Sequence, residues 1–182
     1  MTRLQSGITL LESLVALLVL SIGLLGTAHM MATGLKQTNG SFARTQAIYI
    51  AENLAERMRA NPEGIENMNY AGFDSNTIGD CTNRPAPYCE TIGGAEPVAC
   101  TAAQLAVFDQ YQATCGSGGS TNGSNGVKDL LPAGRIQIIC EDGVIACTPD
   151  STYTIIVSWN ETEQNGAGDQ TKTKHVQHKI LP

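Results

Sequence analysis

The sequence predicts an α+β fold in which one long N-terminal helix packs on an antiparallel β-sheet, with a disulfide-bearing loop region between the two. Three observations lead to this class: an apolar N-terminal run that passes into a helix-periodic segment, β-rich runs near the C-terminus, and six cysteines that all follow residue 80. We expect residues 61–182 to form one globular domain, with residues 61–133 as the loop region and residues 134–182 as the sheet.

The first part of the helix is expected to span a membrane. Residues 8–28 read ITLLESLVALLVLSIGLLGTA and carry one charge, at Glu12. At about 1.5 Å of rise per residue, this run matches a bilayer core of about 30 Å. A secretory signal has its small cleavage residue after the apolar run, whereas Gly7 precedes it here, so cleavage at Gly7 leaves the apolar segment on the mature chain. With Arg3 in the cytoplasm, the chain crosses the inner membrane once and its C-terminal domain is periplasmic.

The helix is predicted to continue to residue 60. Apolar residues recur at spacings of three and four, which marks one helical face; they are Ala43, Ala47, Ile50, Leu54 and Met58. Pro62 disfavours helical geometry at the residue before it. We therefore predict one helix over residues 8–60, apolar all round over 8–28 and amphipathic over 29–60. Glycines weaken it by roughly 1 kcal/mol each relative to alanine, so the stretch from His29 to Ser41 is expected to bend or melt.

The remaining elements are short. A helix is expected at residues 101–112, and turn residues at 141–143 and at 165–168 separate β-rich runs. The predicted strands cover residues 135–140, 144–147, 152–159 and 171–180. Alternating apolar residues in these runs should face the helix across an antiparallel sheet; they are Ile136, Ile138, Tyr153, Ile155, Val157 and Trp159.

The six cysteines predict a disulfide framework. Their number is even and none forms a CxxC pair, which argues against a zinc ribbon or a redox motif, and disulfides require an oxidising compartment such as the periplasm. Cys140 and Cys147 flank a predicted turn and are expected to pair. A local set, Cys81 with Cys89 and Cys100 with Cys115, would complete the framework, although six cysteines allow about 15 full pairings.

Several function classes are disfavoured. A net charge of −6 without a basic run argues against a nucleic-acid surface. The sequence contains no nucleophile elbow, no phosphate loop and no convincing acid–base pair, so neither an enzyme nor a cofactor site is expected. Residues 74–80 only faintly resemble a calcium loop and are expected to form a polar turn. His175 and His178 lie three apart on a strand and point to opposite faces, so they make poor metal partners and are expected to be solvated edge residues.

The N-terminal segment resembles a type IV prepilin. The motif is Gly7–Glu12 (GITLLE), followed by the unbroken apolar run. The resemblance implies that a dedicated membrane peptidase cuts after Gly7 and methylates the new N-terminal residue, Ile8, where phenylalanine is usual. It also implies that Glu12 pairs with the methylated amine of a neighbouring subunit and sets the axial register. The alternative is that Glu12 is simply an acid favoured by the dipole at a helix N-terminus.

Three further stretches resemble the PilV-type minor pilins of type IV pili; they are residues 47–64 (AIYIAENLAERMRANPEG), 130–134 (LLPAG) and 153–161 (YTIIVSWNE). This resemblance implies the lollipop fold of pilins and a role in priming or modifying a pilus. The implied partners are other minor pilins, the major pilin, the prepilin peptidase and the inner-membrane assembly machinery. Two alternatives stay open: a minor pseudopilin of a type II secretion system, and an adhesive module at the pilus tip.

Overall fold

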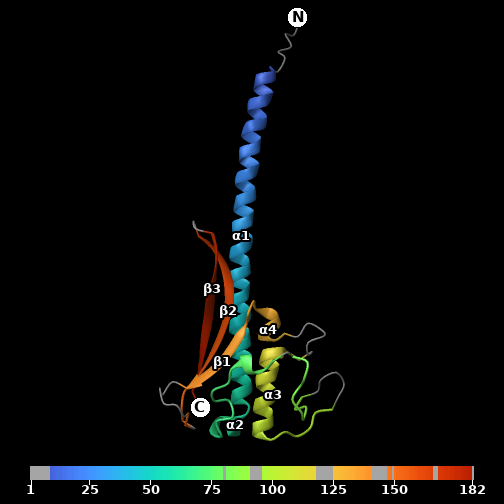
Figure 1. Ribbon diagram of the computed structural model, residues 1–182, viewed down its shortest axis with the longest axis vertical. Helices are drawn as coiled ribbons and strands as arrows, with labels where there is room; N and C mark the ends of the chain where they lie inside the picture. The colour runs from blue at the N-terminus through green and yellow to red at the C-terminus, as the bar shows by residue number, and fades with distance from the viewer. Residues whose placement is uncertain are drawn as a thin grey trace, which may run out of the picture. The chain divides into compact units, whose positions relative to one another are not determined.

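The computed structural model describes residues 9–79, 81–90, 96–117, 125–140, 147–148, 150–165 and 168–181. The chain divides into two compact units, residues 1–41 and residues 42–182. Helix α1 (Leu10–Arg59) belongs to both units, and the other helices and all strands belong to the second (Figure 1). The predicted α+β class, with a long helix on an antiparallel sheet and disulfides in the loop region, is confirmed.

Helix α1 is uninterrupted. The helix begins after Thr9, whose side-chain oxygen accepts the backbone N–H of Glu12 at 3.4 Å, as an N-cap residue does. The bend or melting expected between His29 and Ser41 is not found, because every residue of that stretch is helical. Helix propagation is cooperative, and no proline interrupts the segment, so its scattered glycines reduce stability without stopping the helix.

In the second unit, α1 contributes the apolar face that the periodicity predicted. Ala47, Ile50, Leu54 and Met58 are buried, and Ala43 packs against their cluster. Ala51 and Ala55 are also buried and widen this stripe. Helix α1 ends at Arg59. The short helix α2 (Pro62–Glu66) follows it, with Asn61 as its N-cap.

The sheet has three antiparallel strands in the order β1–β2–β3. They are β1 (Arg135–Cys140), β2 (Tyr153–Asn165) and β3 (Gly168–Ile180). The predicted inward-facing residues are all buried, with Trp159 the least at 3% exposed. The predicted strand at 144–147 and turn at 141–143 lie outside the described residues, except for Cys147, which is not in a strand. The apolar face of the sheet therefore comes mainly from β1 and β2, to which β3 adds Val176 and Ile180.

The loop region contains α2, the 3₁₀ turn η1 (Ser75–Thr77), α3 (Ala102–Cys115) and α4 (Val127–Leu130). Helix α3 runs three residues beyond its predicted end. A reciprocal capping box starts it, because the Thr101 side chain accepts the Gln104 N–H while the Gln104 side chain accepts the Thr101 N–H. Gly116 follows Cys115 with a φ of 72°, the left-handed region that glycine adopts easily, and so ends the helix.

All six cysteines are paired. Cys140 is joined to Cys147, as expected from the turn between them. The local set was wrong: Cys81 pairs with Cys115 and Cys89 with Cys100, so the second bridge is nested inside the first. The reason is the placement of α3, whose last turn lies against residue 81; the Tyr111 hydroxyl on that helix donates to the Cys81 carbonyl at 2.9 Å.

Candidate functional site

Glu12 is the one acidic residue between Thr9 and Leu35, a stretch that contains no Lys or Arg. Its large apolar neighbours in α1, from Leu10 to Leu35, are each more than half exposed. An apolar surface of this extent on an unassembled chain marks an interaction or membrane surface. By length and composition, this part of α1 is long enough to cross a membrane.

The hydroxyl side chains of this first unit form hydrogen bonds within the helix itself. The hydroxyls of Ser21, Thr27, Thr33 and Thr38 each donate to a backbone carbonyl three or four residues earlier, at 2.7–3.1 Å. This local bonding lets hydroxyl side chains lie in an apolar environment. The described part of the chain offers the Glu12 carboxylate no such partner, because Thr9 binds only its backbone N–H. Gly7 and Ile8, the predicted cleavage and methylation residues, lie outside the described residues.

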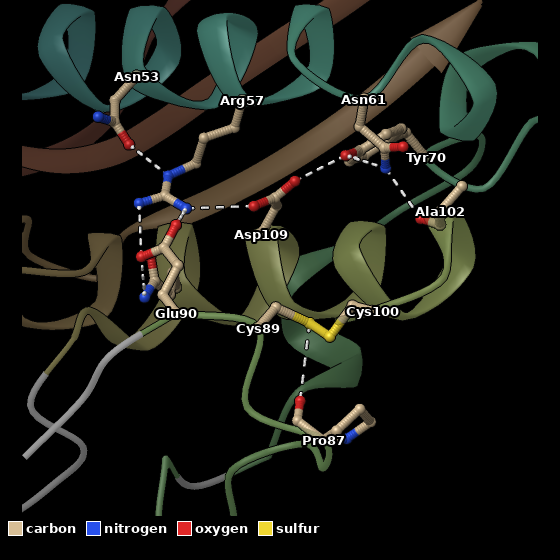
Figure 2. Close-up of polar contacts among 11 residues, drawn as sticks. Asn53, Arg57, Asn61, Tyr70, Pro87, Cys89, Glu90, Cys100, Ala102 and Asp109 are labelled. Atoms are coloured by element: carbon tan, nitrogen blue, oxygen red, sulfur yellow. Dashed lines mark hydrogen bonds and ion pairs between the residues drawn. A yellow bond between two sulfur atoms is a disulfide. The ribbon is translucent and has the colours of Figure 1, made fainter. Parts of the chain in front are cut away.

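A second polar cluster lies inside the second unit, where Arg57 of α1 meets the loop region (Figure 2). Its guanidinium binds Glu90 at 2.5 Å and Asp109 of α3 at 3.2 Å, and its Nε donates to the Asn53 side chain at 3.1 Å. The Asp109 side chain is only 2% exposed, whereas those of Arg57 and Glu90 are 24% and 42% exposed. The cluster therefore contains one almost fully buried carboxylate, that of Asp109, which is paired with the Arg57 cation.

Tyr70 extends this cluster to the end of α1. Its hydroxyl donates to Asp109 Oδ2 at 2.7 Å and accepts from Asn61 Nδ2 at 3.0 Å. Asn61 also donates to the Ala102 carbonyl at 2.8 Å, at the start of α3. Helix α1, α2 and α3 are thus tied together by buried hydrogen bonds, which fixes the loop region on the helix.

Burial and charge oppose each other in this cluster. Burial raises the pKa of Asp109, although the Tyr70 hydroxyl and the Arg57 guanidinium both favour its ionised form. Burial also lowers the pKa of Arg57, but the hydrogen bonds and charges of Glu90 and Asp109 together outweigh it and leave that pKa raised. No local sequence signal indicated this cluster, because Glu90 and Asp109 lie 33 and 52 residues from Arg57.

Two basic side chains from outside bind the segment that faintly resembles a calcium loop. Arg135 forms a two-point ion pair with Asp74, its Nε lying 2.9 Å from Oδ1, and this hydrogen bonding lowers the pKa of Asp74. The Lys128 ammonium donates to the carbonyls of Ile78 and Gly79. Within the described residues, no group of three or more metal-ligating side chains occurs. The segment is therefore a turn held by two internal cations.

A surface groove bears on the alternative of an adhesive module at the pilus tip. A groove of about 160 Å³ between α1 and α3 has Tyr49 as the one aromatic among its described lining residues. Its aromatic content is therefore small for an adhesive sugar or peptide site.

The two histidines of β3 differ in exposure. His175 is exposed and His178 is half-buried on the opposite face, with a buried Nε2 that has no hydrogen-bond partner in the described part of the chain. The expectation that both are solvated was wrong for His178, because its side chain lies on the same face as Ile155.

Comparisons with known proteins bear on both units. Residues 2–28 match the family model of the prokaryotic N-terminal methylation motif, and residues 30–111 match the model described as type IV pilin Tt1218. No curated protein and no solved structure matches the chain. The second match runs from within α1 to α3 and includes the cluster around Arg57. Type IV pilins are structural and non-enzymatic, and neither match specifies a subtype. With the fold, the two matches support a structural subunit of the type IV pilin family, a pilin or pseudopilin.

Proposed function

We propose that the chain is a minor pilin that takes part in assembling or priming a type IV pilus by subunit packing. The observation that carries the proposal is the Glu12 carboxylate, the one acid of an exposed apolar helix stretch whose N-terminus Thr9 already caps. A carboxylate on such a surface costs about 3 kcal/mol in lipid, so a cationic partner is needed. Cleavage after Gly7 creates that partner, the methylated amine of Ile8.

Thr9 already caps the helix N-terminus through the backbone N–H of Glu12, so capping leaves the Glu12 carboxylate available to a neighbouring subunit. Pairing between neighbouring subunits satisfies both charges and spaces adjacent helices by a fixed amount. Because each Glu12 carboxylate pairs with one amine, one acid in the apolar run is enough for this contact between subunits. The carboxylate therefore acts as the register contact, with Ile8 as the residue that receives the methyl group.

The periplasmic placement of the second unit is part of the proposal. Its three disulfides need an oxidising compartment, and residues 8–28 span the inner membrane before the subunit enters the pilus. Three stretches resemble PilV-type minor pilins. Residues 47–64 contain the end of α1 and the start of α2, residues 130–134 precede β1, and residues 153–161 belong to β2. The resemblance of these stretches, together with the cysteine-rich loop region, is what favours a minor pilin over a minor pseudopilin in this proposal.

The proposal is tested by comparing Glu12→Gln with Glu52→Gln, a matched change on the exposed part of α1 in the second unit. Breaking a buried charge pair costs about 3–5 kcal/mol, so we expect the Glu12 variant to be cleaved and membrane-resident but to reach the pilus at least tenfold less. The control variant should assemble normally. Intact mass should show loss of Met1–Gly7 and gain of one methyl group.

Quantitative mass spectrometry of sheared pili distinguishes the alternatives. A minor pilin is expected in the pili at a few per cent of the major subunit or less. Presence only in secretion-system pseudopili would establish the pseudopilin instead. Normal incorporation of Glu12→Gln would show that the carboxylate does not set register.

A further inference from the structure

The disulfides of the loop region do not join cysteines that follow one another in the chain. Cys81 pairs with Cys115, and the bridge between Cys89 and Cys100 lies inside that ring (Figure 2). A chain exported from its N-terminal side presents Cys81 and Cys89 to the oxidising compartment first. At about 5–20 residues of synthesis per second, Cys115 follows Cys89 after roughly 1–5 s. Cys81 therefore meets a wrong partner before its native partner arrives.

Loop statistics favour the same wrong pair. Cys81 and Cys89 are eight positions apart, whereas Cys81 and Cys115 are separated by 34. The entropic cost of closing a flexible loop rises with the logarithm of its length, so an unfolded chain brings the nearer pair together about ninefold more often. Cys100 and Cys115 are then left to each other. Oxidation ahead of folding therefore produces the local set, in which Cys81 is joined to Cys89 and Cys100 to Cys115.

The local set is incompatible with the folded domain. Helix α3 runs from Ala102 to Cys115, so at about 1.5 Å of rise per residue it holds Cys100 about 20 Å from Cys115. A disulfide needs Cα atoms within about 7 Å of each other, so a bridge between these two cysteines prevents α3 from forming. Isolated helices of this length are marginal in water. The helix alone therefore does not form early enough to block the wrong bridge.

Without α3, the contacts that select the native partner of Cys81 are absent. In the folded domain the Tyr111 hydroxyl of α3 donates to the Cys81 carbonyl at 2.9 Å, and Cys115 is fully buried at the end of the same helix. Once Cys140 and Cys147 have also paired, a chain with the local set has no thiol of its own with which to start an exchange. An external thiolate is therefore needed to release it.

We propose that this chain is a substrate of a thiol–disulfide isomerase in the compartment where the second unit folds, and that its nested bridges form through that enzyme. The identity of the compartment as the periplasm rests on the proposed function. The pairing itself does not, because the nested order and the span of α3 are properties of the second unit alone.

Three exchange steps convert the local set into the native one without net oxidation. The isomerase thiolate attacks the Cys81 sulfur and forms a mixed disulfide, and the electron pair of the broken bond leaves on the Cys89 thiolate. That thiolate attacks the Cys100 sulfur and releases the Cys115 thiolate. The Cys115 thiolate then attacks the Cys81 sulfur of the mixed disulfide and releases the isomerase thiolate unchanged. Each original bridge gave two electrons and two protons to a disulfide-bonded thiol oxidase, which became a dithiol.

The proposal is tested in cells that produce the full-length chain, with and without their periplasmic thiol–disulfide isomerase. Thiols are trapped by acid and alkylation at intervals after synthesis, and the bridges are mapped by mass spectrometry of peptides. In wild-type cells we expect an early fraction with the local set that converts to the native bridges. Without the isomerase, the yield of the bridge between Cys81 and Cys115 should fall at least about fivefold. Purified protein disulfide isomerase in a glutathione buffer should restore it in the isolated chain.

Two double variants isolate the nested order as the cause. Cys89→Ser with Cys100→Ser makes Cys81 and Cys115 consecutive cysteines, so their bridge should form equally well with and without the isomerase. Cys81→Ser with Cys115→Ser leaves the inner pair consecutive and should be equally independent of the enzyme. Peptide mapping requires no native fold, so both variants remain informative if their stability falls.

Native bridges formed at the wild-type rate and yield in cells without the isomerase would overturn the proposal. Equal dependence on the isomerase in Cys89→Ser with Cys100→Ser would also overturn it, because the nested order would then not be the cause. Six reduced cysteines in wild-type cells would instead count against the periplasmic placement and hence against the proposed function.

Discussion

Replacing Arg57 with methionine isolates the buried charge cluster. Methionine keeps the apolar stem of the side chain but leaves Asp109, whose side chain is 2% exposed, without its cation. Removing one member of a buried pair costs about 3–5 kcal/mol. Because Arg57 is 24% exposed and Glu90 is 42% exposed, we expect the lower end, a loss of about 3 kcal/mol in the free energy of unfolding.

Arg59→Met is the matched control on the same helix. Arg59 pairs with Glu56 at i,i+3, and their side chains are 45% and 72% exposed, so its loss should cost about 0.3–0.5 kcal/mol. Trp159 is the single tryptophan and is buried in β2, so its fluorescence reports unfolding of the second unit. Both variants are compared with the wild type in guanidinium titrations of the full mature chain in detergent.

The Arg57 variant should also show a particular pH dependence. Burial already raises the pKa of Asp109 above its ordinary 3.8, and loss of the guanidinium raises it further. A folded-state carboxyl pKa above the unfolded value destabilises the fold as pH rises past the unfolded value. The deficit should therefore be small near pH 3.8 and grow toward neutral pH. Equal losses for Arg57→Met and Arg59→Met would refute the buried-pair account.

Three further outcomes follow from the structure. Cys89→Ser should leave only Cys100 open to thiol labelling in the denatured, unreduced protein, whereas labelling of Cys81 would restore the local pairing. Tyr70→Phe strips a buried hydrogen bond from Asp109 and should cost about 1–3 kcal/mol in the guanidinium titration; a loss below about 0.5 kcal/mol would contradict the contact. Hydrogen bonds from two lysines lower the pKa of Glu163 to about 2, so its stabilisation should disappear as pH falls from 4.5 toward 2. Glu163→Gln should lack that component, and a variant titrating like the wild type would exclude it.

Much of the fold was predictable because its signals are periodic. The spacing from Ala43 to Met58 fixes one helical face, and the alternation from Tyr153 to Trp159 fixes one strand face, so local sequence determines what each element buries. The leader and Glu12 form a contiguous motif, so the candidate N-terminal site could be named from the sequence, and the roles of Gly7, Ile8 and Glu12 stay predictions. The helical continuity of residues 29–41 was not, because propensity sums neglect the cooperativity that carries a helix across glycines.

The tertiary contacts of the loop region were not predictable, although its helix α3 was, since those contacts join residues far apart in the chain. Arg57 reaches Asp109 only after α3 has folded back, and the same placement brings Cys115 to Cys81. Nothing in the neighbourhood of Cys81 distinguishes Cys89 from Cys115 as a partner. Turn spacing succeeded for Cys140 and Cys147 because the two cysteines are only seven residues apart.

The nested disulfides have an evolutionary consequence. The outer bridge closes 34 residues and the inner bridge closes 11 of them. Chain inserted between Cys89 and Cys100 lengthens a ring that is already closed, and each doubling of a flexible loop costs only about 0.6 kcal/mol. The frame made by Cys81, Cys115 and α3 is insulated from such changes. Descendants of this chain can therefore diversify the inner ring while the scaffold that carries it stays the same.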